Sequence, residues 1–338
     1  MKKQILIIFC FIFSLFSCRS PKKEISQTKF LMDTICEIKI YCDDENYGQE
    51  IIDKVFKKIE KVDKQFGYTS ESEITKINLA AGKNKVKVSS STFELISKSI
   101  EVSELTNGAF DITTGVLSEL WGFENFSKKT SFVVPKEEKI KKSLSLVGYD
   151  KILLDRNNQV VFLKKPMMKI NLGGIAKGYA LKVAKEMLEE YNIKKFLLNF
   201  GGDIYVRNNL DKKPWRVAVQ HPRDKQRYIC VLDLFNTSIA TSGDYERYFF
   251  YEGKRYHHIF DPHTGYPANN GIISVSVVID DPVMADAIST AMFVLGEKEA
   301  ISLAKKLNAE YIIVKEENNK IKVITSQKIK KYISEKYF

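Results

Sequence analysis

The sequence predicts an α+β fold formed by one mixed domain. Short alternating or apolar runs typical of strands crowd the stretch 196–279, and helical patterns flank it near 47–65 and in 284–296. The 338 residues are 44% hydrophobic and 28% charged, and no internal repeat, low-complexity tract or long linker divides them. This composition is sufficient for one large core with a charged surface.

The first residues predict an export signal in front of that domain. Lys2 and Lys3 lead into the apolar run QILIIFCFIFSLF, which is too short to be a good membrane-spanning helix. The run ends in LFSC at Cys18 and turns polar at once, a pattern that resembles the lipobox of bacterial lipoproteins. We expect a signal peptide (1–17), a polar tether from lipidated Cys18 (18–28) and the domain (29–338). The alternatives are an ordinary signal peptide or an uncleaved anchor.

This start places the folded part in the cell envelope, anchored by its lipid (palmitate is the expected acyl chain) to a membrane and facing the periplasm. The net charge of +11 comes from lysines that are spread out and often paired with glutamates along helices. The sequence has neither a concentrated basic patch nor a known nucleic-acid-binding motif, so no nucleic-acid partner is expected. An anionic substrate or an anionic membrane surface remains compatible with the charge.

The expected elements follow in chain order from their periodicity and turn residues. Strands are expected in 29–42, 86–88, 151–155, 160–164, 168–171, 196–200, 203–206, 215–220, 228–234, 238–242, 248–260 and 273–279, and a hairpin in 311–325. Helices are expected in 47–65, in the segment after the serines at 89–91, after the glycine turn at 173–174, in 284–296 and in 297–308.

Three cysteines remain in the expected domain, Cys36, Cys42 and Cys230. Cys36 and Cys42 are six residues apart on an alternating segment, which is about 20 Å along a strand and beyond disulfide reach. We expect buried thiols, without a disulfide framework or a zinc motif.

Two segments have the residue types that an anionic, metal-bound ligand needs. NLGGIAKG, 171–178, places two glycines and Lys177 where a helix begins, and free N–H groups at a helix start bind anions. In ADAISTA, Asp286 and Thr290 lie one turn apart on one helix face, where they can share Mg²⁺ with phosphate oxygens. The alternatives are a tight turn that requires glycine, and an acid favoured by the helix dipole beside a packed threonine.

Two further segments are open to more than one interpretation. TNGAFDITTGVLSELWGF, 106–123, combines aromatics with a carboxylate that could hold a planar heterocycle, or else simply contributes to the core. HHIFDPHTGYP, 257–267, contains a reverse turn after a strand, and strand alternation directs His257 and His258 to opposite faces. They cannot both bind one ion on a straight strand, and base catalysis by one of them needs independent support.

Taken in order, the segments of this chain resemble the FAD:protein FMN transferase (ApbE) family. The resemblance lies in MDT (32–34), YTSESEITKIN (68–78), TNGAFDITTG (106–115), LWGF (120–123), NLGGIAKGYA (171–180), NFGGD (199–203), WRVAVQHP (215–222), IATSGDYERY (239–248), HHIFDPHTGYP (257–267) and ADAISTAMFVLG (285–296). It implies an α+β fold around FAD and Mg²⁺. It also implies transfer of the FMN half of FAD to a Thr or Ser hydroxyl of an acceptor protein, with release of AMP. Many members of the family are lipoproteins.

The same resemblance assigns residues to roles. Asp286, Thr290 and the carbonyl of Gly174 match the Mg²⁺ ligands, and His258 matches the proposed catalytic base. The flavin-nucleotide contacts match Met32, Tyr68, Ala109, Phe110, Asp111, Asn171, Lys177 and Ile259. Asn171 stands where the family usually has Asp, so the nucleotide meets an amide there instead of a charge. His258 is then expected to face the site, His257 to point outward and His263 to be structural.

Two rival functions use the same residues. An FAD pyrophosphatase would use water as the nucleophile and produce FMN and AMP. A non-catalytic lipoprotein that stores or presents FAD would not need the metal pair Asp286 and Thr290, and this chain has both.

The lipobox interpretation predicts that Cys18→Ser prevents lipidation, because the thiol is the acylated group. The variant protein should leave the membrane fraction for a soluble periplasmic or unprocessed pool. Metabolic labelling with a fatty acid checks this, and label that still enters the Cys18→Ser chain would contradict the assignment.

Overall fold

The computed structural model describes residues 22–337 except 125, 127–130 and 319. The predicted signal peptide and Cys18 therefore lie outside the described residues. The first strand, β1 (Lys23–Leu31), begins before residue 29, so residues 23–28 are part of the sheet instead of a tether. Within the described ranges, no helix is both long and apolar enough to cross a membrane.

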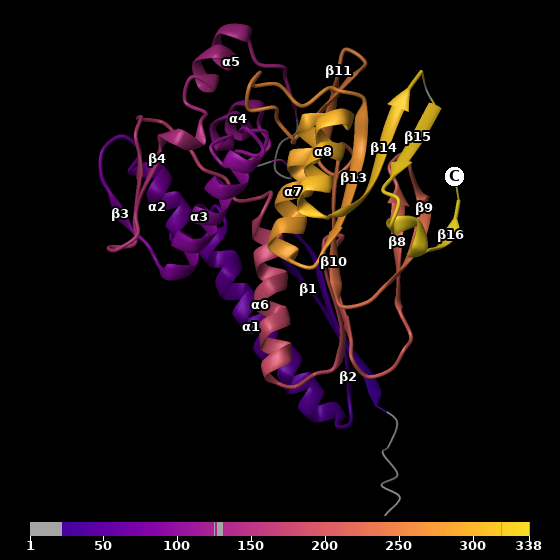
Figure 1. Cartoon of the computed structure of the whole chain (residues 1–338). Coiled ribbons are helices and arrows are strands. Elements are labelled where there is room, and N and C mark those ends of the chain that lie inside the picture. Colours follow the sequence, from indigo (N-terminus) through magenta and orange to yellow (C-terminus); the bar gives the residue numbers. More distant parts are fainter. Residues whose placement is uncertain (1–21, 125, 127–130, 319, 338) are drawn as a thin grey trace, which may run out of the picture.

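An antiparallel sheet of eight strands forms the centre of the molecule (Figure 1). Its order is β1-β2-β6-β7-β10-β13-β14-β15, and every neighbouring pair is antiparallel. The other strands are β2 (Thr34–Cys42), β6 (Lys195–Phe200), β7 (Asp203–Asn208), β10 (Thr237–Gly243), β13 (Ile272–Ile279), β14 (Glu310–Glu317) and β15 (Lys320–Thr325). Together with the helices, this sheet confirms the predicted α+β class.

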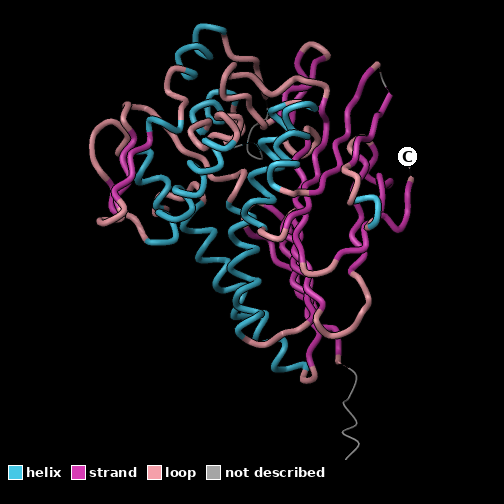
Figure 2. Tube along the Cα trace, in the orientation of Figure 1, coloured by secondary structure: helices cyan, strands magenta, loops and turns pink. Residues whose placement is uncertain are grey.

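Two layers cover the two faces of the sheet (Figure 2). Helices pack on one face, namely α1 (Glu45–Phe66), α6 (Ala176–Glu190), α7 (Pro282–Leu295) and α8 (Glu297–Leu307). A three-stranded sheet packs on the other face and contains β8 (Trp215–His221), β9 (Asp224–Leu234) and β16 (Ile333–Lys336). Because β13 is covered on both sides, seven of its eight residues are buried, which explains its almost continuously apolar sequence.

A smaller lobe extends the helical side. It contains α2 (Glu73–Leu79), α3 (Ser90–Leu105), α4 (Gly115–Trp121), α5 (Glu137–Leu144) and a small sheet of β3 (Val86–Lys87), β4 (Ile152–Asp155) and β5 (Val160–Leu163). An aromatic cluster joins α4 to the hairpin of β11 (Tyr248–Tyr251) and β12 (Lys254–His257). Trp121 lies 5.4 Å from Tyr256, and Phe123 lies 5.7 Å from Phe249, between ring centroids. Short 3₁₀ helices are formed by Tyr149–Lys151 and Ile329–Lys331.

Three strand predictions were wrong. The expected single strand 248–260 is the hairpin of β11 and β12, with its turn at Glu252 and Gly253 (φ 49° and 76°), and it ends at His257. The expected single strand 29–42 contains a hairpin turn at Met32 and Asp33, whose φ angles of 54° and 57° suit a two-residue turn that usually requires Asn or Gly. The expected strand at 168–171 is irregular and forms one isolated bridge at Lys169. Its backbone bonds elsewhere, since Ile170 N donates to the Asn78 side chain at 2.8 Å.

The thiol prediction is confirmed. Cys36, Cys42 and Cys230 are buried and free. Burial raises the pKa of the Cys36 thiol to about 12 and that of Cys230 to about 11, so both are protonated, unreactive core groups at neutral pH.

Helices α6 and α7 touch where each begins, and a glycine permits the contact. A Cβ on Gly178 would lie 2.3 Å from the Pro282 carbonyl oxygen and 2.8 Å from Val283 Cα, so the two backbones would have to separate. We predict that Gly178→Ala lowers the free energy of unfolding by about 3 kcal/mol, measured by denaturant unfolding.

Gly253→Ala is the control for this variant. Its φ is +76° and its new Cβ would meet no atom within 4 Å, so it reports backbone strain alone, roughly 1 kcal/mol. Equal losses in the two variants would mean that the close contact between α6 and α7 does not matter for stability.

Candidate active site

The first turn of α6 is held by bonds from its backbone N–H groups, with Ala176 N donating to the Leu172 carbonyl at 2.8 Å and Gly178 N to Asp286 Oδ2 at 2.9 Å. Its N-cap residue, Ile175, makes no side-chain cap bond. In the preceding turn, Gly173 N donates to Asn171 Oδ1 at 2.7 Å, which holds the glycine turn in shape. The Asp286 carboxylate therefore already lies at this helix start, whose partial positive charge favours anionic groups.

Lys177, in the first turn of α6, lies between two buried carboxylates. Its ammonium pairs with Asp203 at the start of β7 and lies 3.3 Å from Asp286 Oδ1 on α7. Asp203 is 1% exposed and Asp286 is 3% exposed. Burial by itself would lower the pKa of Lys177, but the two carboxylates raise it above its ordinary value, so the ammonium stays charged. Burial raises the pKa of Asp203 to about 7.

The predicted metal ligands lie close to one another. Asp286 and Thr290 are one turn apart on α7, and Thr290 Oγ1 lies 3.1 Å from Ser242 Oγ on β10. A Cβ on Gly174 would lie 3.3 Å from Thr290 Oγ1, which places the glycine turn against this hydroxyl. The set therefore consists of one carboxylate, one hydroxyl and the nearby glycine backbone.

This donor set fits Mg²⁺. Within the described residues, no group of three His, Cys, Asp or Glu side chains could hold a metal ion, so a soft or strongly anionic site is not formed there. Mg²⁺ prefers oxygen ligands, takes one or two carboxylates and completes its shell with water and substrate phosphates. Asp286, Thr290 and Gly174 match that preference.

The 106–111 turn packs directly against the glycine turn. The ring of Phe110 would lie 3.3 Å from a Cβ on Gly174. Asp111 does not point a free carboxylate at the site, because its oxygens accept from Thr113 N at 2.8 Å, Thr113 Oγ1 at 2.6 Å and Tyr149 N at 2.8 Å. Ala109 is buried. The Asp111 carboxylate therefore holds its own loop together.

Three other residues were predicted to contact the flavin nucleotide, namely Tyr68, Met32 and Ile259. Tyr68 is 41% exposed and its phenol hydrogen-bonds the Asn171 side chain, so an accessible aromatic ring stands beside the glycine turn. Met32 occupies the β1–β2 turn, whose next residues contact the β6–β7 turn through Gly201 N and Ile35 O at 2.9 Å. That second turn leads to Asp203, so the Met32 hairpin lies near Lys177, Asp203 and Asp286, which form the lysine cluster. Ile259 is buried next to His258.

His258 lies one residue beyond the end of β12. Its N–H donates to the Arg247 carbonyl at 3.1 Å, and its Nδ1 lies 3.2 Å from the same oxygen. A carbonyl only accepts, so Nδ1 carries the ring proton and Nε2 carries a free lone pair. Burial, with the positive charge of Arg247 second, lowers the pKa of His258 to about 3, so the ring is neutral at pH 7.

The other two histidines of the motif have different surroundings. His257 was expected to point outward, and this was wrong. Its ring is buried, its Nε2 lies 2.9 Å from the Ala268 carbonyl, and it lies 5.3 Å from the ring of Phe293 on α7. The side of the strand end toward which His257 points is covered by helix α7 and does not face solvent. His263 is exposed and joins its own turn to the 106–111 turn through the Asn107 carbonyl at 3.1 Å, as a structural residue would.

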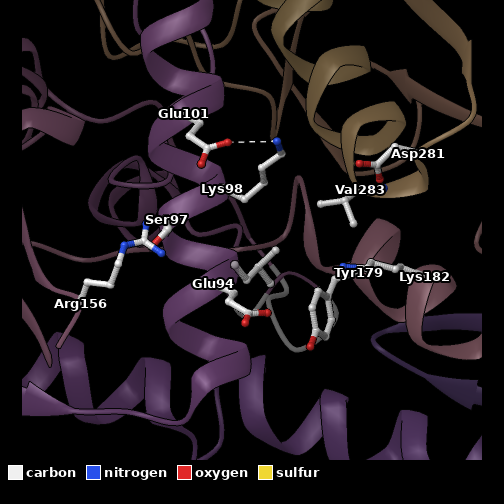
Figure 3. Close-up of a pocket in the computed structure, with 10 residues that line it drawn as sticks. Glu94, Ser97, Lys98, Glu101, Arg156, Tyr179, Lys182, Asp281 and Val283 are labelled. Carbon is white, nitrogen blue, oxygen red and sulfur yellow. Dashed lines mark hydrogen bonds and ion pairs between the residues drawn. The ribbon is translucent and has the colours of Figure 1, made fainter. Parts of the chain in front are cut away.

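A separate hollow of about 330 Å³ lies between α3, α6 and the start of α7 (Figure 3). Glu94, Ser97, Arg156, Tyr179, Lys182 and Asp281 are among the residues that line it. Tyr179 and Lys182 follow Lys177 by two and five positions on α6, which turns them to the opposite side of the helix. None of the predicted site residues lines this hollow, so it is not part of the same site.

The sequence analysis missed two residues that complete the site. Asp203, the partner of Lys177, lies in NFGGD, and Ser242, the partner of Thr290, lies in IATSGDYERY. Both segments belong to the family resemblance, which assigned no role to either residue. A carboxylate directly after two glycines was the available signal, but only the sheet shows what it faces.

The fold and the site together define a class of protein, an antiparallel α+β domain whose lysine–carboxylate centre and oxygen donors suit a phosphate-bearing ligand with a hard cation. The particular family then follows from comparison with known proteins. The chain belongs to the ApbE family, whose profile matches residues 32–313.

Curated relatives and solved structures agree with this membership. An FAD:protein FMN transferase of Haemophilus influenzae is 33% identical over 333 residues, covering 94% of this chain and 95% of that protein. One from Vibrio cholerae is 29% identical and covers 97% and 98%. The crystal structure of the ApbE protein of Thermotoga maritima has a TM-score of 0.84 at 35% identity, covering 92% of this chain and 99% of that one. The flavin transferase ApbE of Vibrio cholerae has a TM-score of 0.81 at 28% identity, covering 92% and 100%.

The environment of His258 predicts that its ring takes up no proton between pH 8 and pH 5. A lowered pKa keeps the neutral form as the pH falls, whereas the unfolded chain protonates this ring near pH 6.5. Imidazole nitrogen NMR on the ligand-free protein measures this, with the His258 signals assigned by their loss in His258→Asn. A midpoint near 6.5 would contradict the buried, neutral ring.

Proposed function

We propose that this chain is an FAD:protein FMN transferase that attaches the FMN half of FAD to a Thr or Ser hydroxyl of an acceptor protein. Membership of the ApbE family and curated relatives matching over nearly their whole length support the activity. The observation that carries the proposal is the convergence at one place of Lys177, the start of α6 and the Asp286–Thr290 oxygen set. This arrangement suits the pyrophosphate of a dinucleotide.

In this proposal, FAD lies across the turns that meet at α6. Tyr68, with its exposed ring, and Phe110 suit the flavin or its ribityl chain, and Lys177 suits the pyrophosphate. The remaining contacts are Met32, Ala109, Asp111, Asn171 and Ile259. Asp111 contributes through its backbone, since its carboxylate is bonded to Thr113 and Tyr149. Asn171 uses its amide to hold the Gly173 N–H and to meet Tyr68.

The reaction forms one P–O bond and breaks one. The acceptor hydroxyl oxygen attacks the FMN-side phosphorus, the bond from that phosphorus to the bridging oxygen breaks, and AMP leaves with the bridging oxygen. The hydroxyl proton passes to His258 Nε2, the ring nitrogen that has a free lone pair. The negative charge of a bound pyrophosphate raises the pKa of His258 from its low value and makes it a better proton acceptor when the substrate is present.

The proposed cofactor is Mg²⁺, held by Asp286, Thr290 and the Gly174 carbonyl. Bound there, it withdraws negative charge from the phosphoryl group under attack. The chain's own contribution is to supply oxygen donors on the rigid α7 helix, where Ser242 positions Thr290.

The proposed location is the periplasmic side of a membrane of the cell envelope, with the lipid on Cys18. Four residues, 19–22, lie between Cys18 and Lys23, where β1 begins. Such a short connection holds the domain close to the membrane surface, where membrane-bound acceptor proteins are within its reach.

The activity is tested with the full chain in detergent, FAD, Mg²⁺ and a candidate acceptor protein, followed by in-gel flavin fluorescence and mass measurement. We expect the acceptor to gain the mass of an FMN group, with AMP formed in equal amount. Chelation of the metal with EDTA should abolish the transfer. Formation of free FMN and AMP on an unmodified acceptor would instead indicate hydrolysis.

His258→Asn should reduce transfer by about 10²–10⁴-fold, the usual effect of removing a positioned base, while FAD binding persists. His221→Asn, on β8 behind the sheet, is the matched control and should retain activity. Loss of FAD binding in His258→Asn, or equal losses in both variants, would reject the role of base. His257→Asn serves poorly as a control because its buried ring supports the fold.

A further inference from the structure

In the lysine cluster, the two carboxylates differ in the hydrogen bonds that each of their oxygens accepts. One oxygen of Asp286, Oδ2, accepts from Gly178 N at 2.9 Å, while Oδ1 has Lys177 as its partner at 3.3 Å. Asp203 binds Lys177 through Oδ2 and accepts from Thr241 N through Oδ1 at 3.2 Å. One ammonium therefore serves two carboxylates, and it lies at the oxygen of Asp286 that the backbone leaves available.

That available oxygen is the one a metal ion at Asp286 and Thr290 would use. An ammonium and a divalent cation repel each other strongly at a shared oxygen in a buried site. The Lys177 ammonium already pairs with Asp203, and its long side chain can give up the 3.3 Å contact with Asp286 Oδ1 without any change in α6. Asp203 is fixed by Thr241 and stays in place to receive it.

We propose that Lys177 competes with the metal ion for Asp286, and that Asp203 is a positioning residue that draws the lysine away. This inference rests on the proposed metal site. The pyrophosphate of FAD completes the displacement, since it offers Lys177 anionic oxygens at the helix start. Nucleotide and metal then reinforce each other's binding, and the ligand-free enzyme holds its metal weakly.

The test measures the affinity of the full chain for Mn²⁺ by electron paramagnetic resonance, as a probe for Mg²⁺, without nucleotide and with saturating FAD but no acceptor. Lys177→Gln should bind Mn²⁺ at least tenfold more tightly than the unaltered protein without FAD, because the competing cation is gone. Asp203→Asn should bind it at least threefold more weakly, because Lys177 then has Asp286 as its remaining acidic partner. FAD should increase the Mn²⁺ affinity less in Lys177→Gln than in the unaltered protein.

A double-mutant cycle separates this competition from a general effect of charge. If Asp203 acts through Lys177, then Asp203→Asn has little further effect in the Lys177→Gln background. If the two charges act independently on the metal, their effects add, and the proposal is overturned. Lys182→Gln removes the same charge from the far side of α6, where Lys182 pairs with Glu186, and is the matched control. An equal gain in this control would also overturn the proposal.

The outcomes distinguish the inference from the proposed function. Absence of Mn²⁺ binding even with FAD would reject the metal site and the competition together. Binding that depends on FAD but is unchanged in Lys177→Gln would reject the competition alone. Thermal unfolding of each variant confirms that it is folded, and Asp203→Asn keeps the shape of the side chain and an oxygen for Thr241 N.

Discussion

The contact between the first turns of α6 and α7 is the constraint on which the site depends. Gly178 lets the two backbones approach, and the Gly178 N–H then bonds directly to Asp286 on the neighbouring helix. This single bond fixes the carboxylate relative to the glycine turn, to Lys177 and to Thr290. A helix pair held apart by even one methyl group would place the anion-binding half of the site and the metal-binding half at the wrong separation.

Burial of charge explains why this site combines one lysine with two carboxylates. Two nearly inaccessible carboxylates beside each other are unfavourable, and Lys177 offsets that repulsion while its own charge is stabilised by them. Lys177 thus stays charged in a place from which water is largely excluded, while burial raises the pKa of its partner Asp203 to about 7. A ligand that brings negative phosphates and a cation can replace these contacts with equivalent ones, which is what an enzyme acting on a pyrophosphate requires.

Burial and nearby charge also set the protonation state of His258, the histidine beside this cluster. Loss of solvent, followed by the positive charge of Arg247 and more weakly that of Lys177, lowers the pKa of His258 and keeps it neutral, and the Arg247 carbonyl decides which nitrogen carries the proton. No carboxylate orients this ring among the described contacts. Its base strength therefore depends on the charge of what is bound nearby, so the substrate itself tunes the group that acts on it.

The sequence alone determined the fold class, the family resemblance, most helices and strands, the buried thiols and the pairing of Asp286 with Thr290, because each depends on local periodicity, on spacing or on an ordered run of motifs. It did not determine the hairpin at Met32, which lacks the usual turn residues, or the irregular segment before Asn171, whose backbone bonds to distant side chains. The inward direction of His257, the use of the Asp111 carboxylate within its own loop and the partnership of Lys177 with Asp203 were decided by tertiary structure. These depend on what a side chain meets across the sheet or from another helix, and neighbours far apart in sequence leave no periodic trace along the chain.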